Sequence, residues 1–247
     1  VHGSSEAPIE DSADLFVQSL KVHAIGLANL LEGIRAEAPE ARLVFAASSR
    51  VFGVPVESPQ DENTSMTPIS PYGISKAAGI GVCAHYRSQY GIHASSAILY
   101  NHESPRRSVG YVTQKIVRAG VAIKRRQQNR LVLGNLGARV DWAHVIDHMR
   151  ALRLIIDASS PGNFVVASGE LNSVRDFGTQ VFDCLGLDFD AYVEEDRTLI
   201  RSVEPEAALV GNSEKLKRMT GWEPKFSLKE LVRDMVNAEL ARSSLDS

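Results

Sequence analysis

The sequence predicts an α/β fold in which a doubly wound parallel sheet precedes a small, mostly helical lobe. Short apolar runs alternate with longer segments of helical period, which is typical of parallel strands covered by helices on both faces. The runs at 42–47 and 94–100 lack strict polar alternation, as expected for strands buried on both sides. After about residue 167 the helical pattern dominates. We therefore expect a sheet domain over 1–167, with insertions that belong to the lobe, and the lobe itself mainly over 168–247.

The first half contains two long helices and two strands. Apolar residues at helical spacing predict a helix over 14–36, through Phe16, Leu20, Ile25, Leu27, Leu30, Leu31 and Ile34. A strand over 42–47 follows, and the Pro- and Ser-rich stretch 55–71 indicates a surface loop. A second helix is expected over 72–90 and ends at Gly91, before the strand over 94–100.

The second half alternates in the same way before it becomes helical. Ser173 is a candidate N-cap for one of these helices. We expect helices over 111–125, 144–156, 174–185, 213–219 and 228–241, and strands over 131–133 and 163–167.

Charge, hydropathy and cysteine content exclude several classes of protein. The net charge of −3 gives no bulk attraction to nucleic acid. There is no apolar run long enough for a bilayer and no signal peptide, so we expect no membrane partner. Cys83 and Cys184 are the only cysteines, and their apolar neighbours predict buried thiols in a reducing, cytoplasmic compartment. The chain opens on Val1 and no glycine-rich turn follows a strand, so we expect an N-terminal part of the sheet domain to be absent.

Ser48, Tyr72 and Lys76 form the candidate catalytic group. Tyr72 and Lys76 lie four residues apart on an expected helix and therefore share a face. A Lys ammonium beside a phenol favours the phenolate and should lower its pKa from about 10. Such a tyrosine accepts a proton from a sugar hydroxyl while hydride leaves to a nicotinamide, whose ribose Lys76 can bind. Ser48 ends the preceding strand and can hydrogen-bond the same oxygen, so we expect the three side chains to converge on one cleft.

The run Asn101-His102-Glu103-Ser104-Pro105-Arg106-Arg107 is a second candidate site. It follows the strand over 94–100, at the carboxyl edge where open α/β sheets bind ligands. Two guanidiniums, an imidazole and an amide at that edge can bind phosphate oxygens.

These segments resemble the extended short-chain dehydrogenase/reductase family of NAD-dependent epimerases and dehydratases, and within it the GDP-mannose 4,6-dehydratase group. The resemblance is carried by 98–107, 112–116, Leu133-Gly134-Asn135-Leu136 and Asp141-Trp142-Ala143-His144. It implies a Rossmann-like domain whose glycine turn lies upstream, NADP or NAD as cofactor, and a nucleotide-sugar substrate, most of all a GDP-hexose.

The resemblance also implies roles for individual residues. His102 and Arg107 would contact the cofactor together with Tyr72 and Lys76. The phosphates or base of the sugar nucleotide would be contacted by Asn101, Lys115 and Arg201, and Arg139 is a further candidate for substrate binding. The helices over 14–36 and 72–90 would pair across a two-fold axis into a four-helix bundle, which implies a homodimer or homotetramer.

Two positions depart from the family pattern. Arg50 stands where the family has a Glu that takes part in proton removal and water elimination, and an arginine cannot act as a general base. Val140 replaces an arginine, and its neighbour Arg139 should point to the opposite face of an extended segment. Glu62, in the adjacent loop, is a candidate replacement acid.

Three functional hypotheses follow from these departures. The first is a dehydratase that oxidises the sugar at C4 and then eliminates water. The second is an epimerase or ketosugar reductase, which needs only the redox step and suits Arg50 better. The third is a nucleotide-sugar-binding protein without turnover.

Several other residues have plain structural interpretations. His144 is expected to cap a helix rather than to bind a metal, because no ligand cluster supports it. The run Lys124-Arg125-Arg126 indicates a solvated helix end. Trp142 and Trp222 are expected to be packing residues. For His23, a structural and a functional role are equally open.

Overall fold

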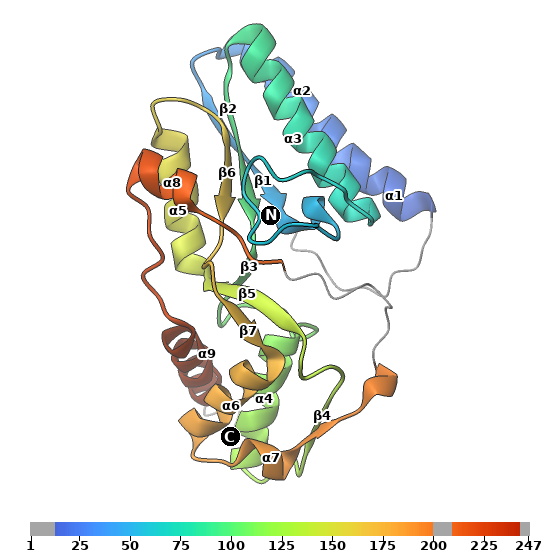
Figure 1. Ribbon diagram of the computed structural model, residues 1–247, viewed down its shortest axis with the longest axis vertical. Coiled ribbons are helices and arrows are strands. Elements are labelled where there is room, and N and C mark those ends of the chain that lie inside the picture. Colours follow the sequence, from blue (N-terminus) through green and yellow to red (C-terminus); the bar gives the residue numbers. More distant parts are fainter. Residues whose placement is uncertain (1–12, 200–208, 243–247) are drawn as a thin grey trace.

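A three-stranded parallel sheet forms the centre of one half of the molecule (Figure 1). The structure, a computed structural model, describes residues 13–199 and 209–242. The strands are β1 (Arg42–Ser48), β2 (His93–Leu99) and β6 (Asn163–Val166), in the order β1-β2-β6. All three are parallel, and β2 is almost wholly buried, as its unbroken apolar run predicts.

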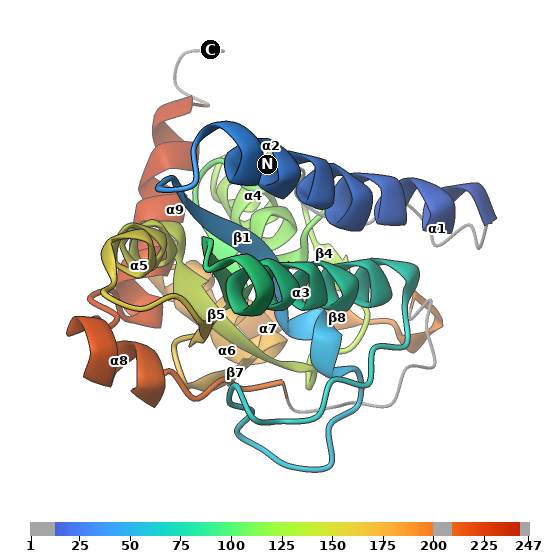
Figure 2. The same ribbon diagram turned by 90° about the horizontal axis from the view of Figure 1, so that it is seen from above.

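Helices cover both faces of this sheet, which confirms the doubly wound architecture. One face carries α1 (Ala13–Leu20), the π-helical turn η1 (Lys21–Ile25), α2 (Gly26–Glu37) and α3 (Pro71–Tyr90). The other carries α5 (Val145–Asp157) and α8 (Glu214–Thr220). Alternate strand residues serve the two cores: Phe45 and Ile98 pack toward α3, whereas Ala97 and Phe164 pack toward α5. Figure 2 shows α1 and α2 running beside α3 along one side of the sheet.

Local signals set the ends of α3. The Ser70 side chain accepts a hydrogen bond from the Gly73 N–H at 3.1 Å, and Pro71 occupies the first turn. Gly91 ends the helix in the left-handed region, at φ 67°. The helix predicted over 14–36 also forms, although η1 interrupts it.

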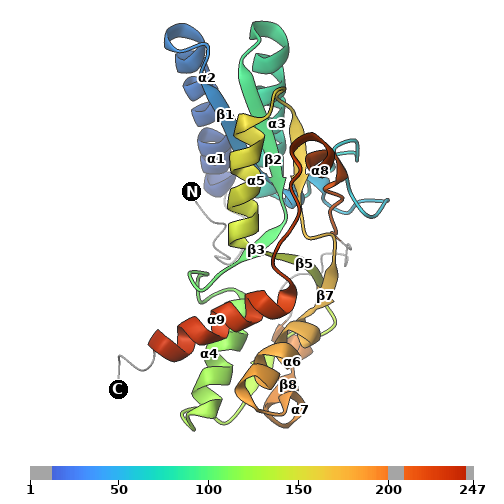
Figure 3. The same cartoon turned by 90° about the vertical axis from the view of Figure 1, so that its left-hand side faces the viewer.

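A second, smaller sheet joins the two halves of the molecule (Figure 3). Its strands are β3 (Asn101–Glu103), β5 (Arg139–His144) and β7 (Leu171–Ser173), with β3 parallel and β7 antiparallel to β5. No strand is predicted from the sequence at β3 or β7. Three residues are too few to show a period, so their pairing partners alone reveal β3 and β7.

The other half of the molecule is mostly helical and has its own core. It comprises α4 (Val112–Lys124), β4 (Leu131–Leu133), α6 (Val174–Leu185), α7 (Phe189–Tyr192), β8 (Val193–Glu195), the 3-10 turn η3 (Arg197–Leu199) and α9 (Leu228–Arg242). Ile116, Trp142 and Phe177 are fully or almost fully buried in this core. Although α4 and β4 precede residue 167, they pack in this helical core. Trp222 follows residue 167 but packs against the three-stranded sheet. Both tryptophans are therefore packing residues, as expected.

One expectation about the cysteines is wrong. Cys83 is buried against the sheet, but Cys184 is exposed, and both thiols are free. The buried side of α6 includes Val181, Phe182 and Leu185, so Cys184 falls on the opposite, solvent-facing side despite its apolar neighbours. Among the described residues, none of the helices is long and apolar enough to cross a membrane.

Candidate active site

Ser48, Tyr72 and Lys76 come together at the carboxyl end of β1. Ser48 is the last residue of β1, and the 3-10 turn η2 (Ser49–Phe52) follows at once and packs against α3. Tyr72 lies in the first turn of α3, where its phenol forms a hydrogen bond with Ser48. The Lys76 ammonium lies 5.5 Å from the centre of the Tyr72 ring. The convergence predicted from the sequence is thus present, while the catalytic roles remain a prediction.

Opposing influences act on the Tyr72 phenol. Burial raises its pKa above the ordinary value, whereas the hydrogen bond from Ser48 and the positive charges of Arg50 and Arg107 lower it. Burial is the strongest influence, so the net pKa shift is upward. The expected net lowering of the Tyr72 pKa is therefore wrong, because burial outweighs the influences that favour the phenolate.

Lys76 is a buried cation, since the residue is only 7% exposed. Its Nζ donates to the Ala46 carbonyl oxygen at 2.8 Å and lies 5.0 Å from the centre of the Phe45 ring. Burial lowers the pKa of Lys76 to about 8. An ammonium has three N–H donors, and within the described part of the chain the Ala46 carbonyl oxygen accepts one of them, which leaves donors for a ligand.

His23 also touches this group of residues. Its ring meets the Tyr72 ring edge-on at 5.5 Å, and its Nδ1 lies 2.9 Å from the Ser75 hydroxyl oxygen. The Ser75 hydroxyl in turn donates to the Tyr72 carbonyl oxygen at 2.8 Å. His23 therefore supports the position of Tyr72 from the side of η1.

Arg107 is held at the edge of the same site. Its Nε lies 3.2 Å from a carboxylate oxygen of Glu103, and its guanidinium lies 3.4 Å from the centre of the Tyr111 ring. Glu103 is itself buried and accepts a hydrogen bond from the Thr113 hydroxyl at 2.7 Å. The run over 101–107 therefore combines a short strand with an arginine fixed by partners on two sides.

His102 lies on β3 and stacks on a second histidine. Its ring centre is 4.6 Å from that of His148, on α5, with 30° between the planes. Its Nδ1 lies 2.9 Å from the Tyr100 carbonyl oxygen, which can only accept, so that nitrogen carries the proton in the pair. Burial lowers the pKa of His102, and burial also holds that of His148 well below its ordinary value. Both rings are therefore neutral near pH 7.

The remaining predicted binding residues lie farther along the chain. Asn101 is exposed at the start of β3, and Lys115 on α4 donates from Nζ to the Val132 carbonyl oxygen at 2.8 Å. Arg139 is exposed at the start of β5, whereas its neighbour Val140 packs against the helical core, so the two point apart as expected. Arg201 lies outside the described residues.

Glu62 is not placed to replace the family carboxylate. Its Oε1 accepts a hydrogen bond from the Val165 N–H at 2.7 Å, which ties the loop before α3 to β6. Since β6 is the strand of this sheet farthest from β1, Glu62 is held away from Ser48. Burial raises the pKa of Glu62 nevertheless.

His144 caps α5 as predicted, with its Nδ1 accepting from the Ile146 N–H at 3.1 Å. Its Nε2 lies 3.2 Å from a carboxylate oxygen of Asp234. Among the residues that the structure describes, no group of three or more His, Cys, Asp or Glu side chains could hold a metal ion.

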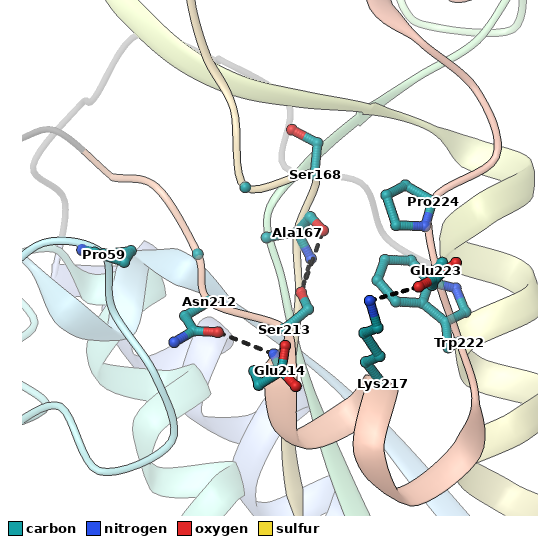
Figure 4. A pocket seen from close by; sticks show the side chains of 12 residues that line it. Pro59, Ala167, Ser168, Asn212, Ser213, Glu214, Lys217, Trp222, Glu223 and Pro224 are labelled. Carbon is teal, nitrogen blue, oxygen red and sulfur yellow. Dashed lines mark hydrogen bonds and ion pairs between the residues drawn. The ribbon is translucent and has the colours of Figure 1, made fainter.

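A pocket of about 500 Å³ lies at the end of β6 (Figure 4). It is lined by Ser168, Asn212 and Ser213, and by the ion pair between Lys217 and Glu223. Ser48, Tyr72 and Lys76 do not line this pocket.

Comparison with known proteins decides the family. A family model for GDP-mannose 4,6 dehydratase matches residues 4–235. This chain belongs to the GDP-mannose 4,6-dehydratase family. It is 35% identical to GDP-mannose 4,6 dehydratase 2 of Caenorhabditis elegans over 99% of this chain and 69% of that protein. It is 38% identical to GDP-mannose 4,6 dehydratase 1 of Arabidopsis thaliana over 89% of this chain and 61% of that protein. The chain thus spans about two thirds of the length of these relatives.

Solved structures show the same fold. The structure of RMD from Pseudomonas aeruginosa, complexed with NADPH, superposes with a TM-score of 0.86 at 22% identity, over 98% of this chain and 80% of that one. The dTDP-glucose 4,6-dehydratase of Bacillus anthracis, in complex with NAD, superposes with a TM-score of 0.80 at 21% identity, over 91% and 70%. The Rossmann-like fold expected from the sequence is therefore confirmed.

Sequence reasoning missed three residues of the site in this family member. Tyr111 stacks on Arg107, Glu103 pairs with it, and His148 stacks on His102. Glu103 lies between His102 and the two arginines of the run over 101–107. This position was a usable signal that its carboxylate pairs with one of them. Tyr111 and His148 gave no signal, since each meets its partner only after the chain folds.

Proposed function

We propose that this chain takes part in NAD(P)-dependent modification of a nucleotide sugar, with oxidation of the hexose at C4 as its first step. The observation that supports this most is the Ser48, Tyr72 and Lys76 cluster at the carboxyl end of β1, in a member of the GDP-mannose 4,6-dehydratase family. Tyr72 would accept the proton of the C4 hydroxyl, and Ser48 would orient the same oxygen.

NADP or NAD, when bound, supplies the hydride acceptor. The donors that Lys76 keeps free suit the vicinal hydroxyls of a ribose. His102 and Arg107 follow the end of β2, which pairs with the end of β1 at Ser48, and would complete the cofactor contacts, as the family resemblance implies. The RMD and dTDP-glucose dehydratase structures, which carry NADPH and NAD, support a nicotinamide cofactor of either kind.

The proposed substrate is a nucleotide sugar, most of all a GDP-hexose. The named relatives, all GDP-mannose 4,6 dehydratases, support this choice. Asn101, Lys115 and Arg201 remain the proposed contacts to its phosphates or base, and Arg139 remains a further candidate for substrate binding.

Arg50 favours a second candidate function. An always-protonated guanidinium cannot shuttle the proton that water elimination requires, and Glu62 is bound to β6 instead of to this site. An epimerase or ketosugar reductase needs the redox step alone, so this function suits the described residues better than dehydration does.

We further propose a homodimer or homotetramer built on the outer face of α1, η1, α2 and α3. Large apolar side chains are exposed along this face: Leu15, Val17, Val22, Ile25, Leu30 and Ile74. Large apolar side chains exposed on helices that pack against one another favour an interface between copies. The free thiols support a reducing compartment, the cytoplasm.

A single reaction tests the function. The full-length gene product is incubated with GDP-mannose and NADP or NAD. The product is identified by mass spectrometry, and the reduced cofactor, which forms only transiently because the hydride returns to the sugar, is followed by absorbance in a single turnover. A product lighter by one water supports dehydration, and an unchanged mass with an inverted centre supports epimerisation. Binding without any turnover would leave only the non-catalytic hypothesis.

A further inference from the structure

A tight turn over 104–107 carries Arg107 and is joined to the last turn of α9. The Arg107 N–H donates to the Ser104 carbonyl oxygen at 2.9 Å, and this bond closes the turn. Pro105 occupies the second position of the turn, which its fixed φ favours. The Pro105 carbonyl oxygen points to a different partner and accepts a hydrogen bond from Nη2 of Arg242 at 3.2 Å. A residue at the end of α9 therefore holds this turn.

Arg242 is itself held by a carboxylate of its own helix. Its Nη1 donates to Oε2 of Glu239 at 2.8 Å, while its Nη2 bonds to Pro105. A guanidinium is planar and its donors keep a fixed geometry. Since one nitrogen is anchored on α9, the other presents a fixed donor to the turn.

Glu239 is a buried carboxylate that α4 also holds. The residue is only 6% exposed, its Oε1 lies 3.4 Å from Nε of Arg118, and its Oε2 accepts from Nε2 of Gln114 at 3.4 Å. Both of these partners lie on α4, and Figure 3 shows α9 lying across that helix. A buried charge is costly unless it is paired and hydrogen-bonded. The packing of α9 on α4 therefore fixes Glu239, and through Arg242 it fixes the turn.

The turn borders the catalytic group. Arg107 is fixed by Glu103, 3.2 Å from its Nε, and by the Tyr111 ring, 3.4 Å from its guanidinium. Both Arg107 and Tyr111 act electrostatically on the Tyr72 phenol. A displaced turn would therefore move the Arg107 guanidinium relative to Tyr72.

We propose that Arg242 is a positioning residue of this site, which acts through the turn over 104–107 to hold Arg107 beside Tyr72. The inference rests on the proposed nucleotide-sugar function, in which Arg107 contacts NADP or NAD. Arg242 itself would touch neither the cofactor nor the reacting atoms. Its loss should therefore weaken cofactor binding and leave the catalytic step nearly unchanged.

Arg242→Lys in the full-length protein tests the inference. The variant keeps a positive charge for Glu239, but an ammonium lacks the rigid fork of donors that reaches Pro105 as well. We expect the dissociation constant of NADP or NAD, measured by titration calorimetry, to rise about fivefold, as for one lost hydrogen bond. The kcat at saturating cofactor should change little. Arg233→Lys, at an exposed position of the same helix, is the matched control and should leave both values unchanged.

A double-mutant cycle with Arg107→Gln separates this role from a purely structural one. Arg107→Gln removes the residue through which Arg242 is proposed to act, so Arg242→Lys should have no further effect on cofactor affinity in that background. A general loss of stability would instead weaken binding equally in both backgrounds.

The other outcomes count against the inference. Unchanged cofactor affinity in Arg242→Lys, with or without a lower Tm, overturns it and leaves the proposed function standing. A loss of affinity that persists in the Arg107→Gln background means that Arg242 acts by another route, and this also overturns it. If Arg107→Gln alone leaves cofactor affinity unchanged, the proposed Arg107 contact is wrong and the inference falls with it. Failure of the unmodified protein to bind both NADP and NAD overturns the proposed function as well.

Discussion

The main-chain carbonyl oxygen of Arg50 lies 2.6 Å from the point that a Cβ atom on Gly73 would occupy. Real Cβ atoms do not come that close to a carbonyl oxygen, so only glycine lets η2 approach the first turn of α3 in this way. The close approach brings Ser48 and Arg50 beside Tyr72, which immediately precedes the glycine.

Gly73→Ala should therefore damage both stability and the site. The added methyl group must push η2 away from α3, and overpacking of this kind costs about 1–3 kcal/mol of unfolding free energy. We expect a lower kcat as well, because Ser48 moves relative to Tyr72. Urea unfolding and turnover of the nucleotide sugar measure the two effects.

The matched control for this variant is Gly81→Ala in the same helix. No atom lies within 4 Å of a Cβ at Gly81, so alanine there should stabilise α3 by up to about 1 kcal/mol. A Gly73→Ala protein as stable and active as the Gly81→Ala protein would show that the close approach does not matter.

Tyr72→Phe should remove hydride transfer and preserve binding. The substitution deletes the hydroxyl that is hydrogen-bonded to Ser48, and loss of a general acid–base group lowers the rate by about 10²–10⁴-fold. Cofactor absorbance under single-turnover conditions measures the rate of hydride transfer. Calorimetry with GDP measures the affinity for the nucleotide. Tyr90→Phe, at an exposed position of α3, serves as the control. Turnover by Tyr72→Phe at the unmodified rate would rule out the proposed proton acceptor.

Lys76→Met should make the protein more stable but inactive. The buried ammonium has a pKa of about 8, against an ordinary value of 10.5. Removing a buried charge that is not paired with a carboxylate among the described residues should add about 1–3 kcal/mol to the unfolding free energy at pH 7, and about 2–4 °C to Tm for each kcal/mol.

The pH dependence gives an independent check on Lys76. Between pH 8 and 10.5 the unfolded chain holds more protons at this side chain than the folded protein does. Stability should therefore rise with pH across that window in the unmodified protein, and this contribution should vanish in Lys76→Met. Thermal unfolding at several pH values measures both. A less stable Lys76→Met protein would mean that the ammonium has a stronger partner than the Ala46 carbonyl.

Arg50→Glu should raise the dehydration of GDP-mannose. The substitution restores the carboxylate that the family pattern has at this position, beside the grouped side chains of Ser48, Tyr72 and Lys76. A restored acid–base group accelerates the reaction by about 10²–10⁴-fold where its absence limits the rate. Mass spectrometry counts the dehydrated product. If the unmodified enzyme already dehydrates GDP-mannose at an ordinary rate, on the order of 1–10 per second, the inference from Arg50 is wrong.

Leu30→Lys should dissociate the proposed dimer. Leu30 is 56% exposed on the apolar face of α2, and a buried lysine at an interface centre is strongly unfavourable. Sedimentation velocity of the full-length protein at micromolar concentration measures the change in mass. Met149→Lys, at an exposed apolar position on α5, should leave the assembly intact. A monomeric unmodified protein would contradict the four-helix interface.

The sequence predicted the long elements well because their signals are local. The helix α6 (Val174–Leu185) lies at its expected position, with Ser173 as its cap in a reciprocal capping box. Gly91 and Ser70 likewise bound α3. The grouping of Ser48, Tyr72 and Lys76 was also predictable, since strand ends meet at one sheet edge and a four-residue spacing shares a helix face.

Only the tertiary structure decided the properties that depend on distant partners. The strand β3 exists because β5 lies beside it, and Cys184 is exposed because α6 turns that face outward. Contacts from other elements set the environment of the site: the Ala46 carbonyl at Lys76, the backbone of β6 at Glu62, and His148 against His102. The pattern of a sequence carries periodicity, caps and chemical type over a few neighbouring residues. Burial, and with it the pKa of Tyr72 and Lys76, arises from residues far apart in the chain, so it appears only when the chain is folded.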